Sequence, residues 1–241
     1  MKYLYLLLNL GTFIFPFALS FDKKVAFYKK WKYLTTAILF VAALFLVWDF
    51  LFTDIGIWSF NDEYITGIKF FGLPIEEILF FFTVPYACVF VYECIITYFP
   101  KDYLKKYAVA ITITIMAGDA VLLFFNYDKL YTASTLAVLG AYMMQLLVIT
   151  RAQWLGRFYL GYLVSLIPFL IVNGVLTAMP VVIYNNSENL NIRLGTIPVE
   201  DMLYMMLLLL MNIGIYERLQ KRFVRTSNDE IPMPMDEPVQ V

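Results

Sequence analysis

Two pairs of acidic side chains, each following a proline, are the residues in this sequence best suited to chemistry. The first copy reads Pro74-Ile75-Glu76-Glu77, and the second reads Pro198-Val199-Glu200-Asp201, 124 positions later. Both copies begin long apolar stretches, so their carboxyl groups lie at the edge of, or inside, a hydrocarbon environment. Ionisable groups are costly there and are functional candidates by default. The duplication predicts two similar units that bring together four proton-donating or proton-accepting groups, namely Glu76, Glu77, Glu200 and Asp201.

Other common kinds of chemistry have no residues to carry them. The chain of 241 residues contains no histidine, which is the usual general base and the commonest zinc ligand. Neither a G-x-G-x-x-G fingerprint nor a P-loop is present, so no site for a tightly held dinucleotide or nucleoside triphosphate is visible. We therefore expect no cofactor and no bound metal, and acid–base work falls to carboxyl groups, with tyrosines as further candidates. The basic residues form no patch that would suit a nucleic acid.

The elements that carry these acids are predicted to be membrane-spanning helices. Hydrophobic residues make up 61% of the chain and charged residues only 15%, far from the composition of a soluble domain. Apolar runs close to the roughly 20 residues that cross a bilayer recur along the chain. The sequence thus predicts an all-α integral membrane protein with seven transmembrane helices, at about 3–20, 33–53, 74–97, 105–125, 131–150, 158–179 and 198–220.

The distribution of basic residues predicts the orientation. Of the 18 lysines and arginines, 14 follow the first, third, fifth or seventh helix, on one side of the membrane. We expect the protein to lie in the cell inner (plasma) membrane. The positive-inside rule then places the N-terminus on the outer side and the C-terminus in the cytoplasm, with both acidic motifs at the outer face. The first apolar run imitates a signal peptide, but the five lysines after it favour a retained helix.

An internal repeat is predicted by an ungapped alignment at the offset of 124. Segment 34–95 shares 11 identical residues with segment 158–219 over 62 positions. The identities include polar residues, such as Asn61 with Asn185 and Glu93 with Glu217, which chance would not favour in apolar segments. We expect a 3+1+3 parallel repeat whose motifs face one another at one membrane depth. Its parts are a first unit at 1–100, a linking helix at 101–126, a second unit at 127–222 and a disordered tail at 223–241.

A single Pro-x-Glu-Glu would be an ordinary helix start, because proline and acids both suit the first turn. Further polar residues at the same depth favour a site instead, and Asp49, Asn173 and Asp119 are the supporting candidates. Glu76 and Glu77 point about 100° apart on a helix, so they can occupy different environments. Aromatic faces stabilise cations, and the candidates for contacting a substrate are Trp48, Trp58, Phe80 and Tyr204.

With its duplicated acidic motif in a seven-helix frame, the chain resembles the small membrane-embedded lycopene cyclases, in the form that fuses two homologous subunits. The resemblance covers the sequence up to about residue 222. It implies a redox-neutral cyclisation of the linear ψ ends of lycopene, normally yielding β-carotene, without the flavin of the unrelated soluble-type cyclases. In this hypothesis one of the four acids protonates C2 and a carboxylate of the cluster later removes the C6 proton. The implied partners are lycopene or a related linear carotenoid, membrane lipid, and other carotenoid enzymes in association.

A small-solute transporter with the same 3+1+3 plan is the main alternative. Such a protein needs a polar path across the membrane, whereas the inner half of this chain has few buried polar candidates beyond Gln145 and Asn212. A retinal protein would need a lysine in the seventh helix, and 198–220 contains none. A membrane prenyl transferase would need aspartates spaced for magnesium, which Asp49 and Asp54 match poorly.

Overall fold

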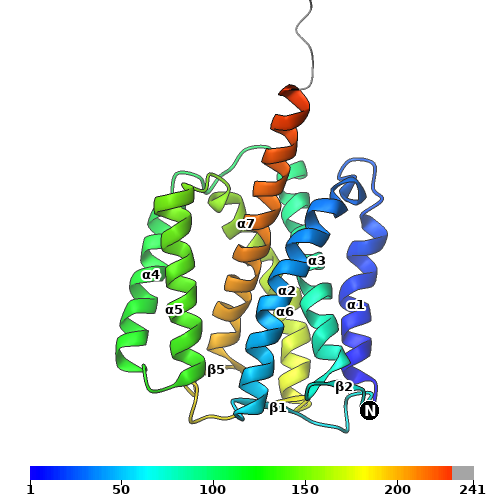
Figure 1. The fold of residues 1–241 in the computed structure, drawn as a ribbon, viewed down its shortest axis with the longest axis vertical. Coiled ribbons are helices and arrows are strands. Elements are labelled where there is room, and N and C mark those ends of the chain that lie inside the picture. Colours follow the sequence, from blue (N-terminus) through cyan, green and yellow to red (C-terminus); the bar gives the residue numbers. More distant parts are fainter. Residues whose placement is uncertain (230–241) are drawn as a thin grey trace, which may run out of the picture.

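The chain folds into a bundle of helices that lie side by side. The computed structural model describes residues 1–229, with side chains described as far as residue 222. A 3₁₀ turn at Phe27–Lys30 precedes α2, and a π-helical segment at Gln145–Thr150 extends α5. The helices of the described part are α1 Leu4–Leu19, α2 Trp31–Asp54, α3 Ile75–Tyr98, α4 Ala108–Phe125, α5 Leu130–Met144, α6 Leu155–Ala178 and α7 Val199–Asp229 (Figure 1).

Six helical segments have the length and composition of membrane spans. Each of them corresponds to one of the helices α2 to α7. The architecture is therefore that of an all-α membrane protein. The first helix differs from the prediction of a full span at 3–20, because α1 has only 16 residues. At 1.5 Å per residue it is about 24 Å long, shorter than a hydrocarbon core of about 30 Å. The predicted tail at 223–241 falls largely outside the described residues, and α7 continues to Asp229.

Short strands at one end of the bundle were not predicted. Two hairpins, β2 Lys69–Phe70 with β3 Leu73–Pro74 and β5 Arg193–Leu194 with β6 Ile197–Pro198, lead directly into α3 and α7. The first hairpin turns through Phe71 and Gly72, both with positive φ, and the second through Gly195 at φ 64°. These conformations suit tight two-residue hairpin turns, which glycine adopts at little cost. The hairpins fix the direction in which α3 and α7 begin.

A third pair of strands joins the two halves of the chain. Strand β1, Trp58–Phe60, pairs antiparallel with β4, Val182–Tyr184, so that Ser59 lies opposite Ile183. These two residues are 124 positions apart, which is also the offset between the acidic motifs. The same offset relates the starts and ends of α2 and α6, each 24 residues long.

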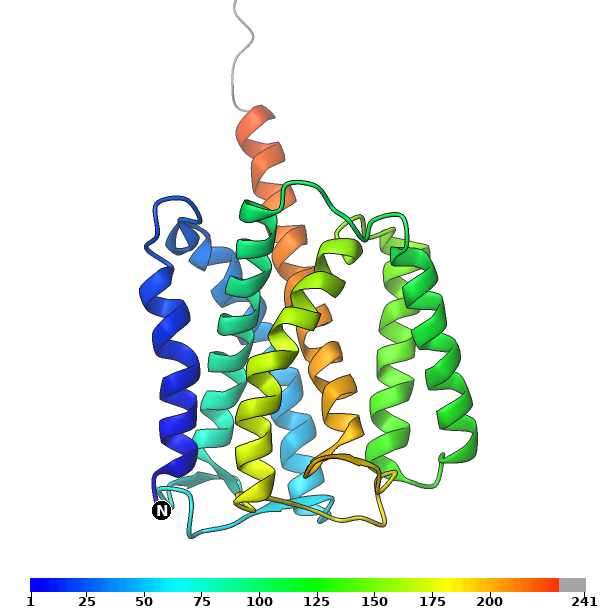
Figure 2. The ribbon, with the colours of Figure 1, turned by 180° about the vertical axis from the view of Figure 1, so that it is seen from behind.

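Helices α3 and α7 form the centre of the bundle. Helix α3 packs against α1, α2, α6 and α7, and α7 packs against α2, α3, α5 and α6. Helix α4 lies at the edge beside α5 (Figures 1 and 2). Both α3 and α7 begin at the end that carries the strands (Figure 1). The two acidic motifs therefore lie at the same end of the molecule.

At the other end, two reciprocal hydrogen bonds connect α3 and α7. Tyr216 donates its hydroxyl proton to Glu93 at 2.6 Å, and Tyr92 donates to Glu217 at 2.6 Å. Glu93 also pairs with Lys30 in the turn before α2. The sequence places Glu93 and Glu217 too far along their helices to join the acidic motifs, and their contacts lie at this opposite end.

Candidate active site

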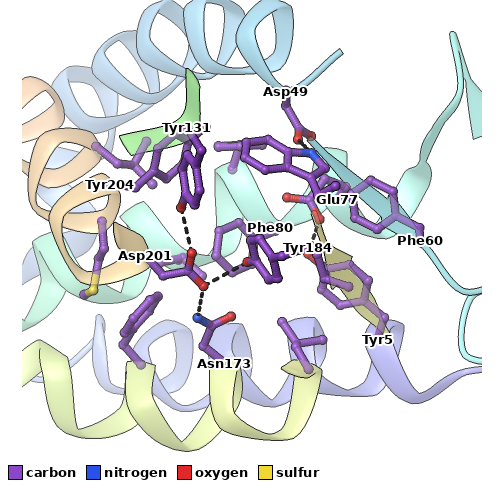
Figure 3. A pocket seen from close by; sticks show the side chains of 18 residues that line it. Tyr5, Asp49, Phe60, Glu77, Phe80, Tyr131, Asn173, Tyr184, Asp201 and Tyr204 are labelled. Carbon is purple, nitrogen blue, oxygen red and sulfur yellow. Dashed lines mark hydrogen bonds between the residues drawn. The ribbon is translucent and has the colours of Figure 1, made fainter. Parts of the chain in front are cut away.

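A small cavity of about 60 Å³ lies where the two halves meet, near the strands (Figure 3). Its walls come from β1, β4 and every described helix except α4. We call it the carboxylate chamber, because the carboxyl groups of Asp49, Glu77 and Asp201 line it. All three side chains are buried. The remaining wall is largely aromatic, including Trp58, Phe60, Phe80, Tyr131, Tyr184 and Tyr204.

Asp201 on α7 accepts more hydrogen bonds than either of the other two carboxyl groups. It accepts hydrogen bonds from Tyr131 at 2.6 Å, from Tyr184 at 2.8 Å and from Asn173 at 2.7 Å. The donors come from α5, β4 and α6. Several hydrogen bonds to a carboxylate favour its charged form, because they replace the water that it loses on burial.

The other two carboxyl groups each have one hydrogen-bond donor. Glu77 on α3 accepts a bond from the Tyr5 hydroxyl at 2.5 Å, and Asp49 on α2 accepts one from the Trp58 indole at 2.7 Å. The second Asp49 oxygen is buried without a partner. Figure 3 shows Asp49 and Glu77 on one side of the chamber and Asp201 with Asn173 on the other.

The remaining two acids of the duplicated motif lie outside the chamber. Glu76 accepts a hydrogen bond from the backbone of Thr66 at 2.7 Å, and Glu200 accepts one from the backbone of Leu190 at 2.6 Å. Glu200 is bonded in addition by the Thr132 hydroxyl. Both carboxyl groups thus tie the loop before the hairpin to the first turn of the following helix. The expected cluster of four is divided, because consecutive residues of a helix face different directions.

Two more sequence candidates lie away from the chamber wall. Asp119 is buried on α4, and α4 packs at the edge of the bundle against α5 and α6. Trp48 lies behind the wall, with its ring 5.5 Å from that of Tyr204 in an edge contact. The other candidates, Asp49, Asn173, Trp58, Phe80 and Tyr204, do line the chamber.

The aromatic rings of the chamber pack against one another. Trp58 has its ring 5.2 Å from Tyr131 and 6.3 Å from Tyr204, both in edge contacts, while Tyr131 stacks on Tyr184 at 6.1 Å. Tyr184 lies in β4, outside the membrane-spanning helices. Burial, together with the charge of Asp201 beside it, holds the pKa of the Tyr184 phenol well above its usual range. The phenol therefore stays protonated and remains a hydrogen-bond donor to Asp201.

A comparison with known protein families gives a match to the lycopene cyclase family over residues 2–95 and 128–219. These two segments cover most of the chain. The chain belongs to the lycopene cyclase family. Membership supports a carotenoid cyclase role, and it agrees with the resemblance inferred from the acidic motifs. A comparison with curated proteins gave no significant match, and neither did a comparison with solved structures.

The bounds of the helices reveal chamber residues of this cyclase that were not predicted from the sequence. Helices α1 and α5 begin 126 positions apart, whereas α2 and α6 begin 124 apart, so the first helix is shifted by two residues relative to the rest. At an offset of 126, Tyr5 corresponds to Tyr131, and each donates to a motif carboxylate. The ungapped alignment at 124 concealed this pair of tyrosines. Phe60 and Tyr184 do correspond at 124, but they lie in a loop that had no predicted structure.

Proposed function

We propose that this protein is a lycopene β-cyclase, which converts the linear ψ ends of lycopene to β rings and yields β-carotene through a monocyclic intermediate. The observation that carries the proposal is the convergence of Asp49, Glu77 and Asp201 from three helices in one buried aromatic chamber. Acids without histidine, held away from water, suit a reaction that begins and ends with proton transfer. No change of redox state is needed.

The proton donor in this proposal is the pair formed by Asp49 and Glu77. Both side chains are buried on the same side of the chamber, and each has one hydrogen-bond donor. Two carboxyl groups that share a site with little water resist carrying two charges, so a proton is retained between them. The unpartnered oxygen of Asp49 is free to hold that proton towards the substrate.

Asp201 takes the role of the base. Its three hydrogen-bond donors support a carboxylate, and its place across the chamber from Glu77 allows proton removal at a different carbon. The acid delivers a proton to C2, which leaves a cation at C1. The electrons of the 5,6 double bond form the C1–C6 bond and move the cation to C5. Asp201 then removes the C6 proton, and the electrons left behind restore the 5,6 double bond.

Aromatic side chains stabilise the cations in this mechanism. A positive charge over the face of an indole or phenol ring is favoured by about 0.5–2 kcal/mol, with the larger value where water is excluded. Trp58, Phe80 and Tyr204 line the chamber together with the proposed acid and base. The same rings exclude water, which would otherwise capture the cation as an alcohol.

We further propose that the chain is a 3+1+3 parallel repeat whose axis passes between Ser59 and Ile183. The equal offsets of the paired strands, of α2 and α6, and of the hairpins support this arrangement. The acidic motifs then lie at the outer face of the plasma membrane, with the N-terminus outside and the C-terminus in the cytoplasm. Asp49 corresponds to Asn173 across the repeat and Phe60 to Tyr184, and these two differences separate the acid side from the base side.

Expression in lycopene-producing cells tests the function. The wild-type protein should convert red lycopene to an orange bicyclic product, identified by chromatography as β-carotene. The Glu77→Gln variant should leave lycopene unconverted, because the proton is retained only while the carboxyl groups of Asp49 and Glu77 share it. Unchanged lycopene with the wild-type protein, or full cyclisation by Glu77→Gln, would refute the assignment.

A further inference from the structure

A second, larger cavity adjoins the carboxylate chamber. It has a volume of about 380 Å³ and lies over α3, between α1 on one side and α6 on the other. Three residues, Phe80, Val84 and Phe169, line both this cavity and the chamber. They therefore form a common wall between the two spaces. We call the larger cavity the α1–α6 groove.

The groove is apolar and extends well beyond the chamber. Along α3 its lining runs from Phe80 to Val91, a rise of about 16 Å at 1.5 Å per residue. This direction leads away from the strands and towards the middle of the helices. Phe15 and Ile171 line the groove from α1 and α6, and their side chains are 73% and 66% exposed on the molecular surface. The groove thus opens sideways, where lipid surrounds the protein.

We propose that the α1–α6 groove binds the polyene chain of the linear carotenoid while one ψ end passes the common wall into the chamber. This inference rests on the proposed cyclase function. The chamber, at about 60 Å³, holds no more than a few water molecules, so an end group enters only when Phe80 and Phe169 turn aside. The rest of a long hydrocarbon must then lie outside the chamber, and the adjoining groove is apolar, elongated and open to lipid.

The corresponding place in the other half of the molecule is filled. At the offset of 124, Val172 of the groove corresponds to Trp48, Phe80 to Tyr204 and Phe169 to Phe45. The Tyr204 ring packs against Trp48 at 5.5 Å and against Phe45 at 5.1 Å. The indole of Trp48 therefore occupies space that Val172 leaves open. The route to the chamber is then the α1–α6 groove, so the two ends of the substrate react one after the other.

Two exposed helical glycines allow a matched test. A Cβ added at Gly11, which lines the groove on α1, meets no atom within 4 Å, and the same holds at Gly118 on α4. Gly11→Phe fills the groove, whereas Gly118→Phe adds the same side chain away from it. We expect Gly11→Phe to lower the rate of lycopene cyclisation about tenfold or more, because misplacement of a substrate is costly. Gly11→Ala and Gly11→Leu should give intermediate losses in order of size, and Gly118→Phe should match the wild type.

Substrate binding gives a readout that does not depend on turnover. Lycopene should co-purify with Glu77→Gln, which lacks one carboxyl group of the proton-donating pair, and should be lost from the double variant Glu77→Gln/Gly11→Phe. Val91→Phe, further along the groove on α3, repeats the comparison at a second position in case Gly11→Phe does not fold. Normal cyclisation and normal lycopene binding in the Gly11 and Val91 variants would overturn the groove assignment while leaving the cyclase function intact. Failure of the wild-type protein to cyclise lycopene would instead overturn the proposed function.

Discussion

Neighbouring acids in this protein have different surroundings and, we propose, different roles. Asp201 lies in the chamber with hydrogen bonds from Tyr131, Tyr184 and Asn173, whereas Glu200 receives a backbone N–H from Leu190 outside it. The first motif divides in the same way, since Thr66 holds Glu76 and Tyr5 holds Glu77. In each motif the first acid binds the backbone of the preceding loop, and we propose that the second acid takes part in the chemistry.

Substituting each acid of the second motif in turn separates these roles. Asp201→Asn should lower cyclisation about 10²-fold or more, since an amide cannot remove the final proton. Glu200→Gln keeps the oxygen that accepts the bonds from Leu190 and Thr132, so the rate should stay within a few-fold of wild type. Product chromatography over a time course measures both. Equal activity of the two variants would refute the assignment of Asp201 as the base.

Asn173→Asp gives Asp201 a neighbouring carboxyl group, as Asp49 gives Glu77. The new carboxyl group replaces an amide that donates to Asp201 at 2.7 Å, so it removes a donor and adds a second acid beside the base. Asp201 and the new carboxyl group would then retain a proton between them, because two close carboxyl groups resist carrying two charges. We expect at least about a tenfold loss of cyclisation. Asn173→Ser, which adds no acid, is the control and should lose less activity. The reverse order would show that the amide serves only as a spacer.

At the scale of elements, the helices were predictable and the strands were not. Apolar runs of about 20 residues specify spans, and the observed helices agree with these runs to within a few residues at most ends, although α7 is longer. Strands of two or three residues have no periodicity to detect. The hairpins nevertheless determine how α3 and α7 are rotated. The sequence therefore identified the acidic pairs, but it could not show that Glu77 and Asp201, instead of Glu76 and Glu200, face the chamber.

The reciprocal bonds at the far end of α3 and α7 should contribute to stability without affecting turnover. Tyr216→Phe removes a donor from Glu93, whose side chain is 1% exposed, and should cost about 1–3 kcal/mol of unfolding free energy. Tyr92→Phe removes the donor from Glu217, which is 15% exposed, so its cost should be smaller. Thermal unfolding in detergent measures the difference. If both variants melt like the wild type, these bonds do not stabilise the helix pair.

On the scale of the whole molecule, one chamber lies between two similar halves. The alignment at 124 identified Asp49 with Asn173 and Glu77 with Asp201 as corresponding residues, and all four line the chamber. It could not pair Tyr5 with Tyr131, because a shift of two residues separates the first helix from the rest. Asp119 was misplaced because depth in a membrane does not specify which neighbour a helix faces. The position of α4 at the edge depends on packing that hydropathy does not encode.

Entry of the substrate through the α1–α6 groove, as we propose, predicts release of the half-cyclised product. After the first ring forms, the substrate must withdraw and present its other end. Labelled lycopene given to the purified protein in lipid, followed by excess unlabelled lycopene, should leave most label in the monocyclic intermediate. In the control, the excess unlabelled lycopene is added before the labelled lycopene, which shows how far dilution alone reduces conversion of the label. Label that passes straight to the bicyclic product would contradict the requirement for withdrawal.

Proton-initiated cyclisation without redox change is the central proposal, and deuterium transfer tests it most directly. Purified protein is exchanged into D₂O in lipid, mixed with no more than an equal amount of lycopene, and the product is examined by mass and by magnetic resonance. The buried carboxyl groups of Asp49 and Glu77 then carry deuterium. We predict a ring with deuterium at C2 and no other change in hydrogen count. A ring that contains no deuterium, or a product with fewer hydrogens than lycopene, would contradict the mechanism.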